Sequence, residues 1–134
     1  MRKRRPFAVN LVFALFLTLT ATVALWSGAS SAETWRFALI GDTPYSDAER
    51  RELPRMLAAI ADSNVDFIVH IGDIKNGQSR CDDEVFQDRH QLFDNSALPF
   101  IFVPGDNEWT DCARVTNGAY DPLERLAALR SLFW

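Results

Sequence analysis

The chain has 134 residues, enough for one domain at most, with 14 Lys and Arg against 18 Asp and Glu. This net negative charge, without a basic stripe, argues against a nucleic-acid partner, because phosphate contacts supply most of the affinity in such proteins. The acidity agrees better with a site that collects cations, although acidic surfaces also serve solubility.

The N-terminal segment has the three parts of a secretory signal. Residues 2–5 are basic, residues 11–25 are almost wholly apolar, and residues 30–32 are small enough for a signal peptidase. We therefore predict a signal peptide over 1–32 and an exported domain over 33–134, periplasmic or secreted. The alternative is a membrane anchor through an uncleaved leader, since the apolar run nearly reaches spanning length. Without the leader, ten basic and 18 acidic residues remain, a net charge of −8.

The domain begins with a strand, a helix and a second strand. Residues 35–40 and 66–71 are apolar runs rich in β-branched and aromatic residues. Between them, Ser46 and Glu49 form a capping-box pair, and Pro54 should kink the following helix or delay its start. The apolar face of that helix has helical spacing and comprises Leu53, Met56, Leu57 and Ile60.

The same order continues to the end of the chain. A helix over 83–95, capped by Asp82 or Asp83, precedes a third apolar run over 100–103. Asp121 followed by Pro122 predicts the start of a last helix. The apolar face of the first of these helices is Val85, Phe86, Leu92 and Phe93, and the amphipathic pattern of the last is Leu123, Leu126, Ala127, Leu129, Arg130 and Phe133.

The alternation of strands and helices predicts an α/β fold with a parallel sheet in β-α-β-α-β order and right-handed crossovers. The strand runs do not alternate cleanly with polar residues, which is typical of strands buried on both faces. Because the sequence ends at Trp134 within an apolar helical face, we expect the domain to be truncated at its C-terminus.

An aspartate preceded by glycine follows each predicted strand: Asp42, Asp73 and Asp106. Ligands bind at the carboxyl ends of parallel strands, so these carboxylates should meet in one crevice. They would repel each other unless a cation lay between them, and a divalent ion suits such ligands. Taken singly, each aspartate could be a helix N-cap or a turn residue. As a set they predict a metal site.

Three sequence blocks resemble the first three motifs of the calcineurin-like metallophosphoesterases: Gly-Asp-Thr-Pro at 41–44, Gly-Asp-Ile-Lys-Asn-Gly at 72–77 and Pro-Gly-Asp-Asn-Glu at 104–108. The resemblance covers most of residues 35–112. It implies an incomplete half of that family's α/β sandwich. It also implies a metal-dependent hydrolase of phosphoesters, a phosphatase or phosphodiesterase, with two divalent ions of Mn, Fe or Zn.

The resemblance also assigns roles and exposes departures. Asp42 would bind one metal, Asp73 would bridge both, and Asp106 would take the place of an asparagine that binds the second. Pro44 stands where the family has a metal-binding histidine, and Asn107 stands where it has the histidine that protonates the leaving group. As a catalytic residue, Asn107 could only donate a hydrogen bond to phosphate. A non-catalytic metal- or phosphate-binding module, or an inactive fragment, therefore stays an alternative.

Five further residues lie close to these motifs. His70 is expected to be a buried strand histidine with a satisfied ring, and Glu108 to orient its loop by hydrogen bonding. Lys75 could reach a phosphate oxygen, although a lysine on a loop is usually solvated. Tyr45 and Trp109 would flank the crevice, either as a substrate wall or as part of the core.

The two cysteines, Cys81 and Cys112, both lie in the predicted domain. In an oxidising compartment an even pair predicts a disulfide. Each cysteine follows a Gly-Asp loop by a few residues, so the bond would join two rims of the crevice.

Overall fold

The computed structural model describes residues 32–134, and residues 35–134 form one compact unit. The signal peptide predicted over 1–32 lies outside the described residues, apart from its last position, so cleavage and export stay predictions. Within residues 32–134 no helix is both long and apolar enough to cross a membrane.

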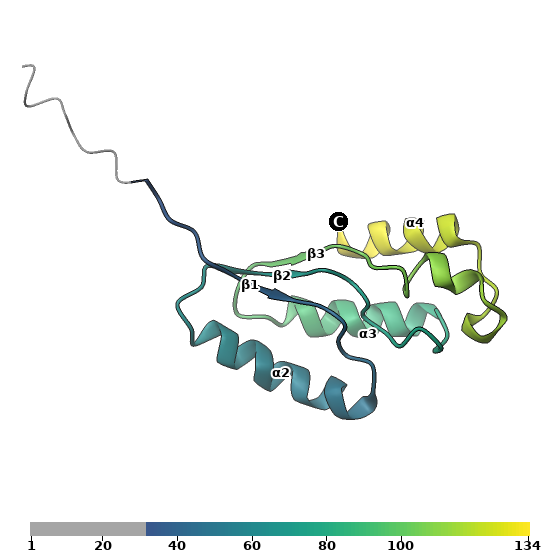
Figure 1. Ribbon diagram of the computed structural model, residues 1–134, viewed down its shortest axis with the longest axis horizontal. Helices are drawn as coiled ribbons and strands as arrows, with labels where there is room; N and C mark the ends of the chain where they lie inside the picture. Colours follow the sequence, from purple (N-terminus) through teal and green to yellow (C-terminus); the bar gives the residue numbers. More distant parts are fainter. Residues whose placement is uncertain (1–31) are drawn as a thin grey trace, which may run out of the picture. The chain divides into compact units, whose positions relative to one another are not determined.

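Three strands, β1 (Phe37–Ile40), β2 (Phe67–His70) and β3 (Phe100–Phe102), form a parallel sheet in the order β1-β2-β3 (Figure 1). The predicted α/β class and β-α-β-α-β order are confirmed. The register pairs Ile40 with His70 and His70 with Phe102, so the three strands end level with one another. The loops that follow therefore leave the sheet at the same edge.

The helices are α2 (Asp47–Ala61), α3 (Asp83–Asp94) and α4 (Pro122–Phe133), with two short 3₁₀ helices, η1 (Thr110–Ala113) and η2 (Val115–Asn117), between β3 and α4. Capping residues begin α2 and α4 as predicted. The Ser46 hydroxyl accepts from the backbone N–H of α2, and the Asp121 carboxylate accepts from that of α4. Asp82 precedes α3 but makes no cap bond, because its carboxylate accepts from Arg80 and Tyr120.

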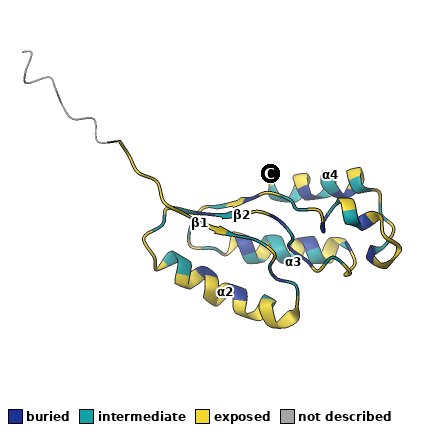
Figure 2. Ribbon diagram, viewed as in Figure 1, coloured by how far each residue is buried: buried dark blue, intermediate teal, exposed yellow. Residues whose placement is uncertain are grey.

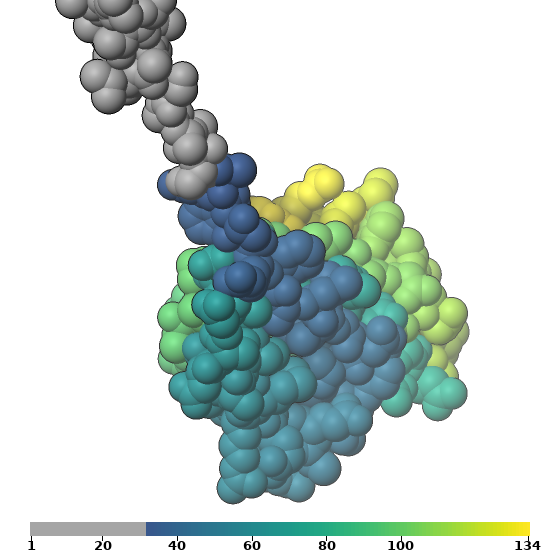
Figure 3. Space-filling model, turned by 60° about the vertical axis from the view of Figure 1, so that its left-hand side comes forward, coloured from purple at the N-terminus to yellow at the C-terminus, as the bar shows by residue number. Residues whose placement is uncertain are grey.

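The predicted effect of Pro54 on the start of α2 is wrong. The helix begins at Asp47 and continues through Pro54. Proline removes one helical hydrogen bond, whereas the flanking Leu53 and Leu57 are buried in the core and hold the helix against the sheet. Burial of this face of the helix therefore outweighs the local preference of a single residue. The opposite face of α2 forms part of the molecular surface in Figure 3.

The amphipathic pattern predicted for α4 does not match the burial of its N-terminal end. Leu123 is 71% exposed, whereas Arg125 is only 5% exposed. The guanidinium of Arg125 donates to the carbonyl of Cys81 at 2.9 Å and lies over the ring of Tyr120, 4.5 Å from its centroid. A hydrophobic pattern could not anticipate this orientation, because it depends on polar partners from distant segments.

The sheet is buried on one face only, which contradicts the prediction of burial on both. Ile68 and Phe102 face the helices and are 0% and 5% exposed. Six apolar residues of the strands and their ends are 47–66% exposed within the described part of the chain: Trp35, Phe37, Leu39, Ile71, Ile101 and Val103 (Figure 2). Right-handed crossovers between strands added in one direction place successive helices on the same face. Accordingly, α2 and α3 both lie below the sheet in Figure 1.

Candidate metal site

The three predicted aspartates lie at the carboxyl edge of the sheet. Hydrogen bonds continue beyond the strands, from Asp42 N to Gly72 O at 3.1 Å and from Val103 N to His70 O at 2.9 Å. Burial is the largest cause that raises the pKa of the Asp73 carboxyl, and the charges of Asp106 and Asp42 raise it further. The three residues that the sequence singled out therefore follow strands that end at the same edge of the sheet.

Two of the aspartates adopt a backbone conformation that side-chain-bearing residues rarely use. The φ angles of Asp42 and Asp73 are 55° and 58°, in the left-handed region. Gly72, before Asp73, has a φ of 96°, and a Cβ there would lie 2.0 Å from the backbone nitrogen of Gly105. The loops after β2 and β3 therefore touch through glycine backbone, which explains why Gly-Asp pairs end these strands.

The hydroxyl of Tyr45 lies at the centre of this group. It donates to Asp42 Oδ1 at 2.8 Å, lies 3.3 Å from Asp73 Oδ2, and accepts from Asn107 Nδ2 at 3.3 Å. Burial, the hydrogen bond to Asp42 and the charge of both aspartates raise the pKa of Tyr45. The phenol therefore stays protonated between the carboxylates. Tyr45 had been expected at the flank of the crevice; instead it touches two of the predicted ligands.

Asn107 links the loops around the site. Its backbone N–H donates to Asp73 Oδ1 at 3.2 Å, and its side-chain amide donates to Lys75 O at 3.1 Å as well as to Tyr45. The residue is 8% exposed. In this arrangement Asn107 holds the tyrosine hydroxyl and the Asp73 carboxylate in place, and its catalytic role stays a prediction.

Glu108 joins the loops that follow β2 and β3. Its carboxylate accepts from the backbone N–H of Gly105 at 2.7 Å, of Asp73 at 3.0 Å and of Ile74 at 3.3 Å. Burial raises the pKa of Glu108 to about 7, although the hydrogen bonds from the three backbone N–H groups act in the opposite direction. Both oxygens are engaged, so Glu108 orients the loops, as expected, and is not directed toward a metal.

The buried His70 is satisfied by backbone on both sides. Nδ1 accepts from Gly72 N at 3.1 Å, so Nε2 carries the proton and donates to Thr43 O at 2.9 Å. Burial lowers the pKa of the imidazole, which is 0% exposed. The expected structural role is confirmed. His70 therefore fixes the backbone at Thr43, two residues before Tyr45.

The expectation of a solvated Lys75 is wrong. The side chain is 1% exposed, and its ammonium donates to Asn76 O at 3.1 Å and Ser79 O at 2.8 Å. Burial lowers its pKa, whereas the carboxylates of Glu108, Asp111 and Asp73 raise it. Lys75 therefore places a buried positive group near the carboxylates and stabilises the loop after Asp73.

Trp109 is the second aromatic residue that was predicted at the crevice, either as a substrate wall or as part of the core. It packs against the core.

The predicted disulfide between Cys81 and Cys112 is confirmed. Both residues are 0% exposed, and their sulfurs lie 3.6 and 3.7 Å from the carbonyl oxygen of Asn107. The bond joins the segment after β2 to η1, and so restrains the loop that carries Asn107.

The donor atoms at this edge are oxygens. Within residues 32–134 no group of three or more His, Cys, Asp or Glu side chains is arranged to hold a metal ion. The carboxylates of Asp42 and Asp73 nevertheless both lie within hydrogen-bonding distance of the Tyr45 hydroxyl. Carboxylate oxygens suit hard divalent ions such as Mg²⁺ and Mn²⁺. The chemistry of the two carboxylates therefore fits such an ion.

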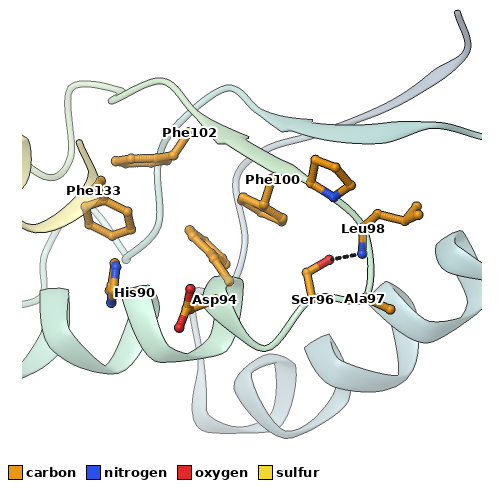
Figure 4. Close-up of a pocket in the computed structure, with 10 residues that line it drawn as sticks. His90, Asp94, Ser96, Ala97, Leu98, Phe100, Phe102 and Phe133 are labelled. Atoms are coloured by element: carbon orange, nitrogen blue, oxygen red, sulfur yellow. Dashed lines mark hydrogen bonds between the residues drawn. The ribbon is translucent and has the colours of Figure 1, made fainter.

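A separate cavity of about 400 Å³ lies beside β3 and the end of α3 (Figure 4). It is lined by aromatic rings, with His90 and Asp94 from α3 at one side. The ring of His90 meets that of Phe133 edge-on, with centroids 5.2 Å apart. None of the three site aspartates lines this cavity, so it is not part of the candidate metal site.

Comparison with protein families matches residues 36–131 to the calcineurin-like phosphoesterases. The match contains all three Gly-Asp pairs and both cysteines. No curated protein and no solved structure matches the chain.

Proposed function

The chain belongs to the calcineurin-like phosphoesterase family, and from this premise we propose that it hydrolyses phosphoesters at a metal site formed by Asp42, Asp73 and Asp106. The observation that carries the proposal is the position of these aspartates at the level carboxyl ends of three parallel strands. Such an edge is where parallel α/β sheets bind ligands. Family membership supports metal-dependent phosphoester hydrolysis in general; the residue roles and the substrate belong to the proposal.

Each residue has a distinct part in this proposal. Asp73 follows the central strand, β2, and would contact both of two divalent ions of Mn, Fe or Zn. Asp42 would hold the first and Asp106 the second. When bound, such ions orient a phosphate ester and lower the pKa of a water to yield a hydroxide nucleophile. Glu108 and Asn107 keep the Asp73 loop in place through its backbone N–H and its carboxylate.

A second candidate function is a non-catalytic module that binds metal or phosphate. It is favoured by Pro44, which offers no ligand, and by Asn107, which cannot protonate a leaving group near neutral pH. The amide N–H groups of Asn107 are already donated to Lys75 O and Tyr45. We favour the hydrolase, because the metal ions themselves stabilise the charge of the transition state.

The location is proposed with the function. We propose that the leader predicted over 1–32 exports the protein to the periplasm or the medium. The disulfide between Cys81 and Cys112 supports this, since such bonds persist in oxidising compartments.

The test is hydrolysis of p-nitrophenyl phosphate and of bis-p-nitrophenyl phosphate by the full-length gene product, after removal of metal and addition of Mn²⁺, Zn²⁺ or Fe²⁺. We expect metal-dependent release of p-nitrophenol that the variant D73N loses. The variant D66N is the control, because Asp66 accepts from Arg36 N before β2, at the opposite end of the strand from Asp73. Bound metal without turnover of either ester would favour the binding module instead.

A further inference from the structure

We propose that the cavity beside β3 and the end of α3 is a second binding site, for a small organic cation that joins an ammonium group to an apolar body. The cavity measures about 400 Å³ and is separate from the candidate metal site, because none of the three site aspartates lines it. Its volume lies within the range of about 300–1,000 Å³ that small-molecule sites occupy. The inference does not depend on the proposed phosphoesterase activity.

Aromatic rings form the walls of the cavity and hold one another in place. Phe93 and Phe102 are 3% and 5% exposed. The ring of Phe93 stacks on that of Phe100, with centroids 4.4 Å apart, and the centroids of the Phe102 and Phe133 rings are 4.5 Å apart. Side chains that are already fixed lose little freedom when a ligand enters. The walls therefore suit a rigid apolar group such as a ring.

Two polar side chains of α3, those of His90 and Asp94, line one side of the cavity (Figure 4). They are four residues apart on the helix and so share one of its faces. Among the lining residues, all of which belong to the described part of the chain, Figure 4 shows a single hydrogen bond, from Leu98 N to Ser96 Oγ at 3.3 Å. The exposed carboxylate of Asp94 is therefore free of bonds to the other lining residues and available to a ligand.

The charge around the cavity favours a cation over an anion. Asp94 is the last residue of α3, where the partial negative charge of the helix dipole also attracts cations. The last turn of α3 contains no basic residue, and within residues 32–134 no Lys or Arg lines the cavity. The protein itself therefore supplies no partner cation there. The ammonium group of a ligand would contact the Asp94 carboxylate while its apolar body packs against the phenylalanine rings.

The test is proton NMR of the full-length protein, titrated at constant pH with 2-phenylethylammonium and separately with its uncharged counterpart, 2-phenylethanol. The chain has two histidines, whose ring C2 protons report on two places. His90 lines the cavity, whereas His70 does not line it and is 0% exposed. We expect 2-phenylethylammonium to shift the His90 signal until it saturates, and to shift the His70 signal less. Methylammonium, which lacks the apolar body, should give no saturable shift. The variant H90Q assigns the two signals.

Removal of one charge separates the ammonium contact from apolar binding. D94N should bind 2-phenylethylammonium about two- to fivefold more weakly than the wild type, as for an exposed ion pair, and should bind 2-phenylethanol unchanged. E84Q is the matched control, because Glu84 is an exposed carboxylate in the first turn of the same helix and does not line the cavity. Circular dichroism checks that both variants fold. The inference is overturned if the His90 signal shows no saturable shift, if the wild type binds both phenylethyl compounds equally, or if D94N binds the ammonium compound as tightly as E84Q.

Discussion

Removal of the Cys81–Cys112 disulfide should destabilise the domain strongly. The two cysteines are separated by 31 residues along the chain. In the chain-entropy treatment, closing a loop of this length disfavours the unfolded state by about 3.7 kcal/mol. A domain of this size has a total stability of about 5–15 kcal/mol, so the bond accounts for a large share of it.

The effect can be measured as a shift in melting temperature. For a domain of about 100 residues, 1 kcal/mol corresponds to roughly 4–8 °C, so the double variant C81A/C112A should melt about 15–30 °C below the wild type. Alanine is chosen because both sites are 0% exposed and a free thiol or hydroxyl there would need a new partner. Circular dichroism in oxidising buffer gives both melting curves.

A reductant separates the cross-link from the change of side chain. Adding a phosphine reductant should lower the melting temperature of the wild type toward that of C81A/C112A and leave the variant unchanged. If the variant melts within about 5 °C of the oxidised wild type, the loop-closure argument is refuted. Two free thiols found by mass spectrometry of unreduced protein would refute the bond itself.

Three further predictions concern the site and its support. D73N should retain less metal than D42N or D106N when the ions are measured by mass spectrometry; if D73N retains the most, the bridging role of Asp73 is wrong. G72A should fold poorly, because its Cβ would lie 2.0 Å from a backbone nitrogen of the loop after β3; an unchanged melting temperature would contradict this contact. Burial lowers the pKa of His70 from its ordinary value of 6.5, so the unfolded chain binds a proton that the folded one does not. Stability should therefore fall as the pH drops below 6.5, by at most about 1.4 kcal/mol per pH unit. In urea titrations H70Q should flatten this slope, and the control H90Q should leave it unchanged.

The family, the order of the strands along the chain and the position of the aspartates could all be predicted from local patterns. Apolar runs that end in Gly-Asp pairs indicate strands of a parallel sheet, and the φ of 96° at Gly72 explains why one of those glycines is needed. The disulfide was predicted from an even number of cysteines and the leader. These features depend on short-range backbone preferences or on composition, which the sequence displays directly.

Other features depended on contacts that no local pattern displays. Arg125 is buried because the carbonyl oxygen of Cys81, 44 residues earlier in the chain, accepts from its guanidinium. Lys75 is buried because its own loop folds back so that the carbonyl oxygens of Asn76 and Ser79 accept from its ammonium. The one-sided burial of the sheet follows from the spatial order β1-β2-β3, which the order along the chain does not specify.

The sequence by itself determined that three carboxylates reach one edge of a parallel sheet, because each follows the end of its strand. Only the tertiary structure decided that the hydroxyl of Tyr45 lies between two of them, 2.8 Å from Asp42 and 3.3 Å from Asp73. The physical reason is that the direction of a side chain after a strand is set by the turn that follows it. Here that turn is held by His70, 27 residues further along the chain, through its hydrogen bond to Thr43 O.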